Sequence, residues 1–185
     1  MTPLSLSTCV SALLAGAASL WTCAAAADPA VTAPPGASNM SVFQAWNAFI
    51  APKGLGGKTC FVVERPEDAT SSAPVSHRDP AFLYVTSVPA QTLHNQVSTI
   101  AGYTFAANAH VTADVDGVTF PMFLDPAQPD TAWAVTNQEP ALVEAMKHGT
   151  TLTLRGTSVR GAPITDTYPL AGMHAALDWL AQNCP

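Results

Sequence analysis

Histidine is the residue type in this sequence with the widest catalytic and metal-binding uses. The five histidines are His77, His94, His110, His148 and His174. No two of them have the i, i+4 spacing of a helix face or the alternate spacing of a strand face, so a shared metal site would need chance convergence in the fold. The sequence therefore predicts no metal site and no cofactor.

Two short motifs resemble functional loops but lack essential residues. Ser158 lies in GTSVRG, where a nucleophile elbow needs glycine two residues on either side of the serine; Arg160 occupies the second of these places. Asp114 and Asp116-Gly117 resemble the start of a calcium loop, but the later carboxylates and the closing glutamate are absent. We therefore predict no catalytic residues, and we interpret Asp116-Gly117 as a two-residue hairpin turn.

Four residues are candidates for a binding surface: Trp133, Arg155, Arg160 and Asp166. The three charged ones lie on a hairpin expected over Gly149–Leu170, where they could instead pair with one another as strand neighbours. Tryptophan is likewise more often a core or half-buried anchor than a ligand platform. The structural interpretation is favoured for all four, and the binding interpretation stays open.

The first 27 residues have the composition of an export signal. They carry no charged side chain, and their apolar run Val10–Trp21 is too short to span a bilayer as a mature anchor. The sequence Ala-Ala-Ala ending at Ala27 is an A-x-A site, which predicts cleavage between Ala27 and Asp28. A second interpretation is lipid attachment at Cys23, although the preceding Trp-Thr pair fits a lipobox poorly.

Cysteine usage agrees with export. Of the four cysteines, Cys9 and Cys23 lie before the expected cleavage site, which leaves Cys60 and Cys184. In an exported chain, two cysteines at opposite ends of the core most simply form one disulfide, with Cα atoms about 4.4–6.8 Å apart. Two buried free thiols are the alternative; a metal pair is disfavoured because no second Cys or His lies at ligand spacing to either one.

Charge and length limit the classes of partner. The 185 residues include 7 Lys+Arg and 13 Asp+Glu, a formal net charge of −6. Without a basic run, the chain has no electrostatic basis for binding nucleic acid or anionic lipid. No segment after the leader is long and apolar enough to cross a membrane. We expect an unidentified protein or envelope partner, and the sequence does not predict an oligomeric state.

Hydrophobic periodicity predicts a mainly β fold. Residues 28–41, rich in Ala, Pro, Gly and Ser, are expected to be a disordered spacer, followed by a single β-rich domain over 42–185. The expected strands are 42–50, 59–65, 81–88, 93–100, 110–115, 118–124, 130–135, 150–154 and 164–168, with a loop over 66–79. Helices are expected at 139–148, ending in a left-handed Gly149, and at 172–183. Together these elements predict an antiparallel β-sandwich or flattened barrel with two α-helices packed on it.

Several of these stretches resemble the invasion-associated locus B family of exported proteins of Gram-negative bacteria. They are Lys58-Thr59-Cys60, NQVS and IAGY in 95–103, DTAWA in 130–134, the helix at 139–148, and GTSVRG with TDTY in 156–168. The resemblance covers roughly Lys58 to Cys184. It implies a secreted or envelope-associated β-rich domain, with some members linked to host-cell invasion, and it brings no catalytic residues to carry over.

The sequence thus leads to two functional hypotheses. The first is a non-enzymatic periplasmic, envelope or secreted protein with a role in envelope or host interaction and virulence. The second is a carbohydrate-binding module or an unrecognised hydrolase. A flat aromatic strip on the surface would favour sugar binding, whereas a cleft that gathers His94 or His110 with a carboxylate and a serine would favour the hydrolase.

Overall fold

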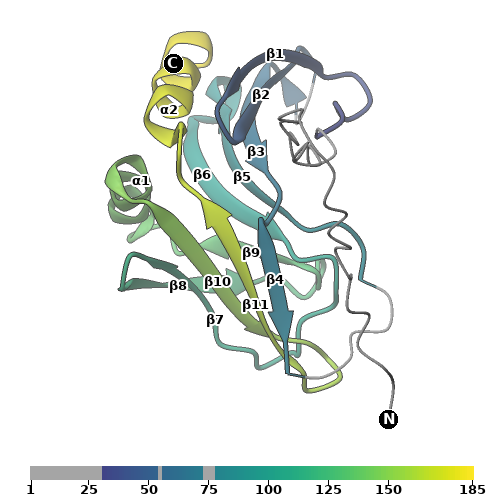
Figure 1. Ribbon diagram of the computed structural model, residues 1–185. Coiled ribbons are helices and arrows are strands. Elements are labelled where there is room, and N and C mark those ends of the chain that lie inside the picture. The colour runs from purple at the N-terminus through teal and green to yellow at the C-terminus, as the bar shows by residue number, and fades with distance from the viewer. Residues whose placement is uncertain (1–30, 54–55, 73–77) are drawn as a thin grey trace, which may run out of the picture. The chain divides into compact units, whose positions relative to one another are not determined.

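The computed structural model describes residues 31–53, 56–72 and 78–185 (Figure 1). The predicted signal peptide, the cleavage site between Ala27 and Asp28, the lipid-attachment candidate Cys23, and His77 lie outside these residues. The described part of the chain contains eleven strands, two α-helices and a short 3-10 helix, η2 (Pro89–Gln91).

The first two strands form a hairpin that the sequence predicted as a single strand. They are β1 (Ser38–Phe43) and β2 (Trp46–Ala51). Gln44, in the turn between them, has φ +54°. Because a two-residue turn separates the strands, the alternation of side chains restarts at Trp46, which explains the mixed periodicity of this stretch. Strand β1 also begins within residues that we assigned to the disordered spacer, and Trp46 is fully buried.

The next three antiparallel strands of the sheet carry most of the apolar residues of the N-terminal half. They are β3 (Thr59–Glu64), β5 (Phe82–Val88) and β6 (Leu93–Ile100). Strand β3 is buried on both faces, which agrees with its continuous apolar run. One face contributes Cys60 and Val62 to the main core, and the other contributes Phe61 and Val63 to a smaller cluster with Phe49.

Strand β4 (Asp68–Ser71) was not predicted, since we expected a loop over residues 66–79. All four of its residues are exposed, and it pairs only with β11 (Pro163–Pro169), with Thr165 opposite Thr70. An edge strand without a buried face has no alternation of apolar and polar residues, so its sequence cannot be distinguished from that of a polar loop.

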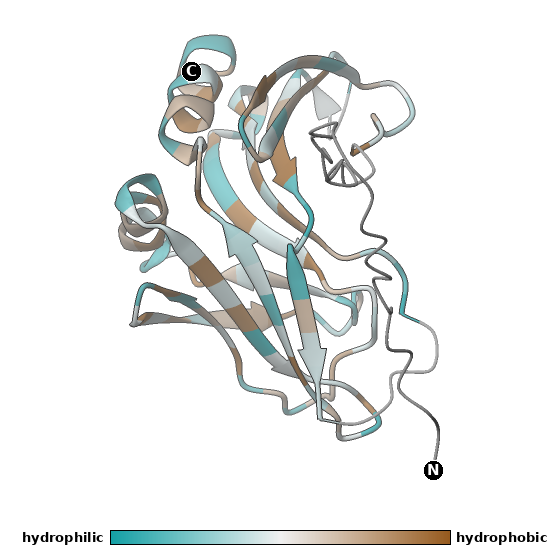
Figure 2. Ribbon diagram, in the orientation of Figure 1, coloured by the Kyte–Doolittle hydropathy of each residue, from teal (hydrophilic) through white to brown (hydrophobic). Residues whose placement is uncertain are grey.

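The central part of the sheet follows the prediction closely. Its strands are β7 (Val111–Val115), β8 (Val118–Leu124), β9 (Thr131–Ala134) and β10 (Thr151–Thr157). Asp116 and Gly117 connect β7 to β8 with φ of +47° and +93°, as a hairpin turn with two left-handed residues requires. Hydrophobic and hydrophilic residues alternate along β10 (Figure 2) because one face lies on the core and the other faces solvent.

The two predicted helices are present as α1 (Glu139–His148) and α2 (Met173–Asn183). The left-handed cap predicted for Gly149 is wrong: this residue is extended, with φ −79° and ψ 171°. The position favours glycine for a different reason. A Cβ atom here would lie 2.6 Å from Val115 Cγ1 and 2.9 Å from the carbonyl oxygen of Ala145, so the close approach of the chain to β7 excludes a side chain.

All eleven strands of the described residues belong to one sheet, ordered β1-β2-β3-β5-β6-β9-β8-β7-β10-β11-β4. Strands β2 and β11 lie far apart in this order, yet the indole N–H of Trp46 donates to the carbonyl oxygen of Pro169 at 3.0 Å. The sheet therefore folds over on itself without closing. The predicted antiparallel β fold with two helices is confirmed, and of the two expected forms the sandwich, not the barrel, is the one observed.

The main core fills the space between the folded sheet and the two helices. Its largest fully buried side chains come from both halves of the sheet and from both helices: Trp46, Leu83, Leu142, Met146, Leu152, Leu154, Tyr168, Met173 and Leu180. No helix of the described residues is long and apolar enough to cross a membrane.

Candidate functional site

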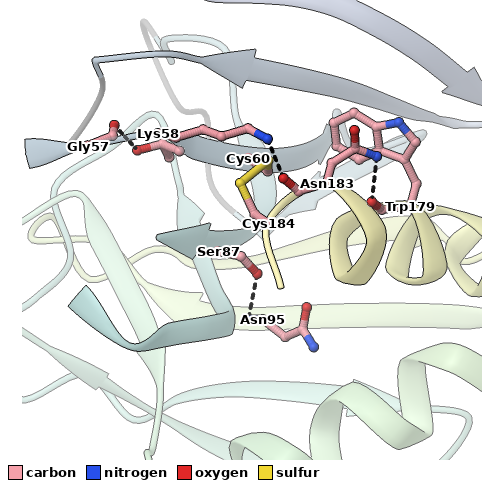
Figure 3. The surroundings of a disulfide bond; sticks show 9 residues. Gly57, Lys58, Cys60, Ser87, Asn95, Trp179, Asn183 and Cys184 are labelled. Atoms are coloured by element: carbon pink, nitrogen blue, oxygen red, sulfur yellow. Dashed lines mark hydrogen bonds between the residues drawn. A yellow bond between two sulfur atoms is a disulfide. The ribbon is translucent and has the colours of Figure 1, made fainter. Parts of the chain in front are cut away.

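The predicted disulfide between Cys60 and Cys184 is confirmed (Figure 3). Their Cα atoms lie 5.9 Å apart, within the range expected from disulfide geometry. Cys60 is buried in β3, and Cys184 is buried directly after α2. The ammonium group of Lys58 also donates to the carbonyl oxygen of Asn183, so two bonds fasten the end of this helix to the start of β3.

Helix α2 covers the core with one apolar face. Met173, Leu177 and Leu180 are buried, as their helical spacing predicted, and Ala176 is buried with them. On its flank, the ring of Trp179 packs against Phe43 with centroids 6.5 Å apart. Tryptophan at this position is thus a packing residue between the helix and the first hairpin.

Asp166 lies in the interior, where it pairs with Arg78. One guanidinium nitrogen of Arg78 donates to Asp166 Oδ1 at 2.7 Å and a second donates to Oδ2. The Arg78 Nε and Nη2 groups also donate to the carbonyl oxygen of Ala101, at 2.9 and 2.8 Å. The side chain of Asp166 is 1% exposed. This planar, two-point contact between an arginine and a carboxylate is the geometry that holds charged groups in a protein interior.

The hairpin pairing expected among Arg155, Arg160 and Asp166 is therefore wrong for Asp166. Arg155 is opposite Thr165 in the β10–β11 register, and Asp166 is opposite Leu154. Since side chains alternate between faces, Asp166 points to the core while Arg155 points to solvent. Arg160 lies in the exposed turn between the two strands.

Two tyrosines lie beside the buried ion pair. Arg78 lies 5.3 Å from the centroid of the Tyr103 ring, and Tyr168 is fully buried two residues after Asp166. Burial, and then the nearby charge of Asp166, raise the pKa of both phenols well above their usual value. Burial alone would lower the pKa of Arg78, but its hydrogen bonds and charge contact with Asp166 outweigh this and raise it.

The properties of this buried cluster indicate a structural role. The Tyr168 hydroxyl has no hydrogen-bond partner of good geometry among the described residues. The nearby Thr99 hydroxyl, which donates to Phe82 O at 3.0 Å, lowers the Tyr168 pKa by less than burial raises it. Neither phenol is ionised at neutral pH, and the carboxylate is held by two donors. None of these groups is therefore poised as a nucleophile or general base.

Trp133 lies on the opposite, outer face of the sheet, in a row of residues that are cross-strand neighbours. We define the outer row as Val63, Tyr84, Ser98, Trp133 and Phe123, on β3, β5, β6, β9 and β8. At one end Val63 is buried in the smaller apolar cluster; at the other, Phe123 is 44% exposed. The rings of Trp133 and Phe123 are stacked, with centroids 5.6 Å apart and an interplanar angle of 23°.

Among the described residues, His94, His110, His148 and His174 do not form a catalytic group with Ser158. His94 and His110 are exposed, and Ser158 is buried, with its Oγ accepting from Ala162 N at 3.2 Å inside the β10–β11 turn. His148 and His174 do meet, with ring centroids 5.9 Å apart across α1 and α2. Across residues 31–53, 56–72 and 78–185, no group of three or more His, Cys, Asp or Glu side chains is arranged to hold a metal ion.

Sequence reasoning missed Arg78, Tyr84 and Phe123. Arg78 has no signal of its own, because it precedes a strand in a polar segment and its partner is 88 residues away. Tyr84 and Phe123 could have been found from strand alternation, which places each on the face opposite to the buried residues beside it. Their alignment with Trp133 depends on strand order, which the sequence did not predict.

Comparisons with known proteins agree with this fold. The model of the family described as invasion associated locus B (IalB) protein matches residues 46–181. The crystal structure of invasion associated protein B from Bartonella henselae is similar, with a TM-score of 0.53 and 18% sequence identity over 78% of this chain and 97% of that one. At this identity the structural likeness shows the fold alone. No curated protein matches the chain at a significant level. Since the family model spans most of the sequence, the chain belongs to the invasion-associated locus B family.

Proposed function

We propose that this chain is an exported, non-enzymatic protein that acts in the periplasm, in the envelope or outside the cell, through a binding surface with a role in envelope or host interaction. The disulfide between Cys60 and Cys184 is the observation that carries the proposal. Disulfides of this kind persist in oxidising compartments and are rare in the cytosol. The apolar leader that ends in an A-x-A site supplies the route to such a compartment.

The positions of the chemically active residues support the non-enzymatic part of the proposal. Asp166 forms an ion pair with Arg78 in the interior, and Ser158 accepts a backbone hydrogen bond in a turn. In the part of the chain that the structure describes, no hydrogen bond joins either of them to a histidine. The outer row reaches the surface with its partly exposed residues Tyr84, Ser98 and Trp133 and with the exposed ring of Phe123, and such aromatic residues are suited to binding.

Fractionation of cells that express the full chain tests export. We expect a periplasmic or secreted product whose intact mass corresponds to a chain beginning at Asp28, two hydrogens lighter than the fully reduced form. A mass that matches a diacylated or triacylated chain beginning at Cys23 would contradict cleavage after Ala27 and place the protein on a membrane surface. Recovery of the uncleaved chain in the cytosol would contradict export itself.

The interaction role is tested by binding of the purified exported protein to isolated envelopes and to host cells. Binding should be saturable and should fall after reduction and alkylation of the disulfide, with folding followed in parallel by circular dichroism. Turnover of ester or glycoside substrates would contradict the non-enzymatic assignment. If Ser158→Ala abolished this turnover while leaving the melting temperature unchanged, the hydrolase alternative would be favoured.

A further inference from the structure

We propose that the outer row binds an extended, uncharged, β-linked oligosaccharide lying across the strands. This inference rests on the proposed function and deepens it by naming the class of ligand. Its basis is a set of aromatic rings on one sheet face, in which Tyr84 and Trp133 are separated by Ser98 and Phe123 is adjacent to Trp133, with neutral hydrogen-bonding side chains between and beside them.

The spacing of the rings is set by the sheet. Tyr84 on β5 and Trp133 on β9 are both cross-strand neighbours of Ser98 on β6, so two inter-strand steps separate them, about 9.5 Å. This is close to the length of one disaccharide unit in an extended β-linked chain, in which every second sugar presents the same face. Serine, between the two rings, is small enough to leave room for the intervening sugar and offers a hydroxyl to it.

The charge of the surface selects the ligand class. The outer row contains no ionisable group other than the Tyr84 phenol, whose pKa is raised by burial, so the row is uncharged at neutral pH. The neighbouring positions on the same face of β5 and β6 are Thr86 and Gln96 on one side of the row, and Phe82 and Ile100 on the other. Arg65 lies over Phe82, in the next row, 6.0 Å from the ring centroid. Neutral hydroxyls and amides beside apolar rings complement a neutral sugar, which has polar edges and an apolar face.

The rings are already held in place before a ligand binds. Trp133 stacks on Phe123, and Tyr84 packs against Phe61 and Phe82 with centroid distances of 6.0 and 6.1 Å. Since these side chains lose little rotamer freedom on binding, the entropic cost of ordering them is smaller than for mobile side chains. The row is therefore pre-organised as a shallow platform, which suits a linear polymer better than a compact ligand.

The test is calorimetric titration of the exported protein, purified from cells that express the full chain, with chitohexaose and cellohexaose. We expect at least one of the two to bind. Trp133→Ala and Tyr84→Ala should each weaken the binding about tenfold, the equivalent of one aromatic contact. Ser98→Arg, which keeps both rings but fills the gap between them, should abolish binding. The matched control is Val159→Ser, because Val159 is 65% exposed on a turn outside the row and its replacement should leave the affinity unchanged.

The melting temperature of each variant separates loss of binding from loss of fold. Trp133→Phe, which keeps an aromatic ring, should retain most of the affinity. The inference is overturned if neither hexasaccharide binds at millimolar concentration, or if Ser98→Arg binds as well as the native protein. It is also overturned if the native protein is a dimer that Ser98→Arg dissociates, because the row would then cover a second copy of this chain. Mass analysis of the recovered sugar tests the proposed non-enzymatic function separately, because cleavage of the sugar would contradict that function. An exported protein that binds envelopes but no sugar would contradict this inference alone.

Discussion

Arg78 and Asp166 form a buried, two-point ion pair that joins the segment before β5 to the middle of β11. Their side chains are 17% and 1% exposed. The same guanidinium group also holds the carbonyl oxygen of Ala101 at the end of β6, so a single side chain connects the two halves of the folded sheet.

Breaking this pair on one side should destabilise the protein strongly. Asp166→Asn leaves the Arg78 charge without its counter-ion in a largely buried position, which should lower the free energy of unfolding by about 3–5 kcal/mol. The double substitution Arg78→Met/Asp166→Leu removes both charges and should recover much of the loss. Urea denaturation of the three proteins measures this. A double variant less stable than Asp166→Asn would show that the hydrogen bonds to Ala101, and not the charge pair, dominate.

Removal of the disulfide should loosen α2 before the rest of the fold. The bond closes a loop of 124 positions, and Cys184→Ser should lower stability by about 2–5 kcal/mol. Because α2 is the last helix of the chain and is held otherwise by one apolar face and by the Lys58 hydrogen bond to Asn183, its amides should exchange with solvent first. Hydrogen exchange of the native and Cys184→Ser proteins tests the order. Thiol titration of the unfolded, unreduced native protein should find no free thiol at Cys60 or Cys184.

Gly172 and Gly161 provide a matched pair for separating backbone strain from a steric clash. Both have positive φ, +92° and +79°, but a Cβ on Gly172 would lie 2.0 Å from the carbonyl oxygen of Phe43, whereas Gly161 has open space. Gly161→Ala should therefore cost about 1–2 kcal/mol for the left-handed backbone alone. Gly172→Ala should cost a further 1–3 kcal/mol or so, because α2 and β1 must separate. Equal shifts in the urea midpoints would contradict the close approach of these elements.

The tyrosines should resist ionisation in the folded protein. Burial raises the pKa of Tyr84, Tyr103 and Tyr168, the three tyrosines of the chain. A raised folded pKa contributes stability that is complete below the unfolded value, about 10, and is lost as the pH rises toward the folded value. The tyrosinate absorbance should therefore remain low at about pH 10 and then appear together with alkaline unfolding. A full tyrosinate signal near pH 10 from a protein that is still folded would contradict this burial.

The sequence by itself determined the features that depend on short-range pattern. The Asp116-Gly117 turn was predictable because few pairs of residues tolerate positive φ angles at both positions. Helix α2 was predictable from the spacing of Met173, Leu177 and Leu180. The pairing of Cys60 with Cys184 followed because only two cysteines remain beyond the expected leader.

The tertiary structure decided the features that depend on strand order and on which face is covered. Strand β4 is exposed at an edge of the sheet, so its sequence shows no alternation of apolar and polar residues. Arg78 contacts Asp166 only because the sheet folds over on itself. The outer row exists because β9 lies between β6 and β8 in the sheet, although residues 101–130, which include β7 and β8, separate β6 from β9 in the chain. Local propensities do not encode such contacts, because they arise only when the strands take their order in the sheet and the sheet folds over its core.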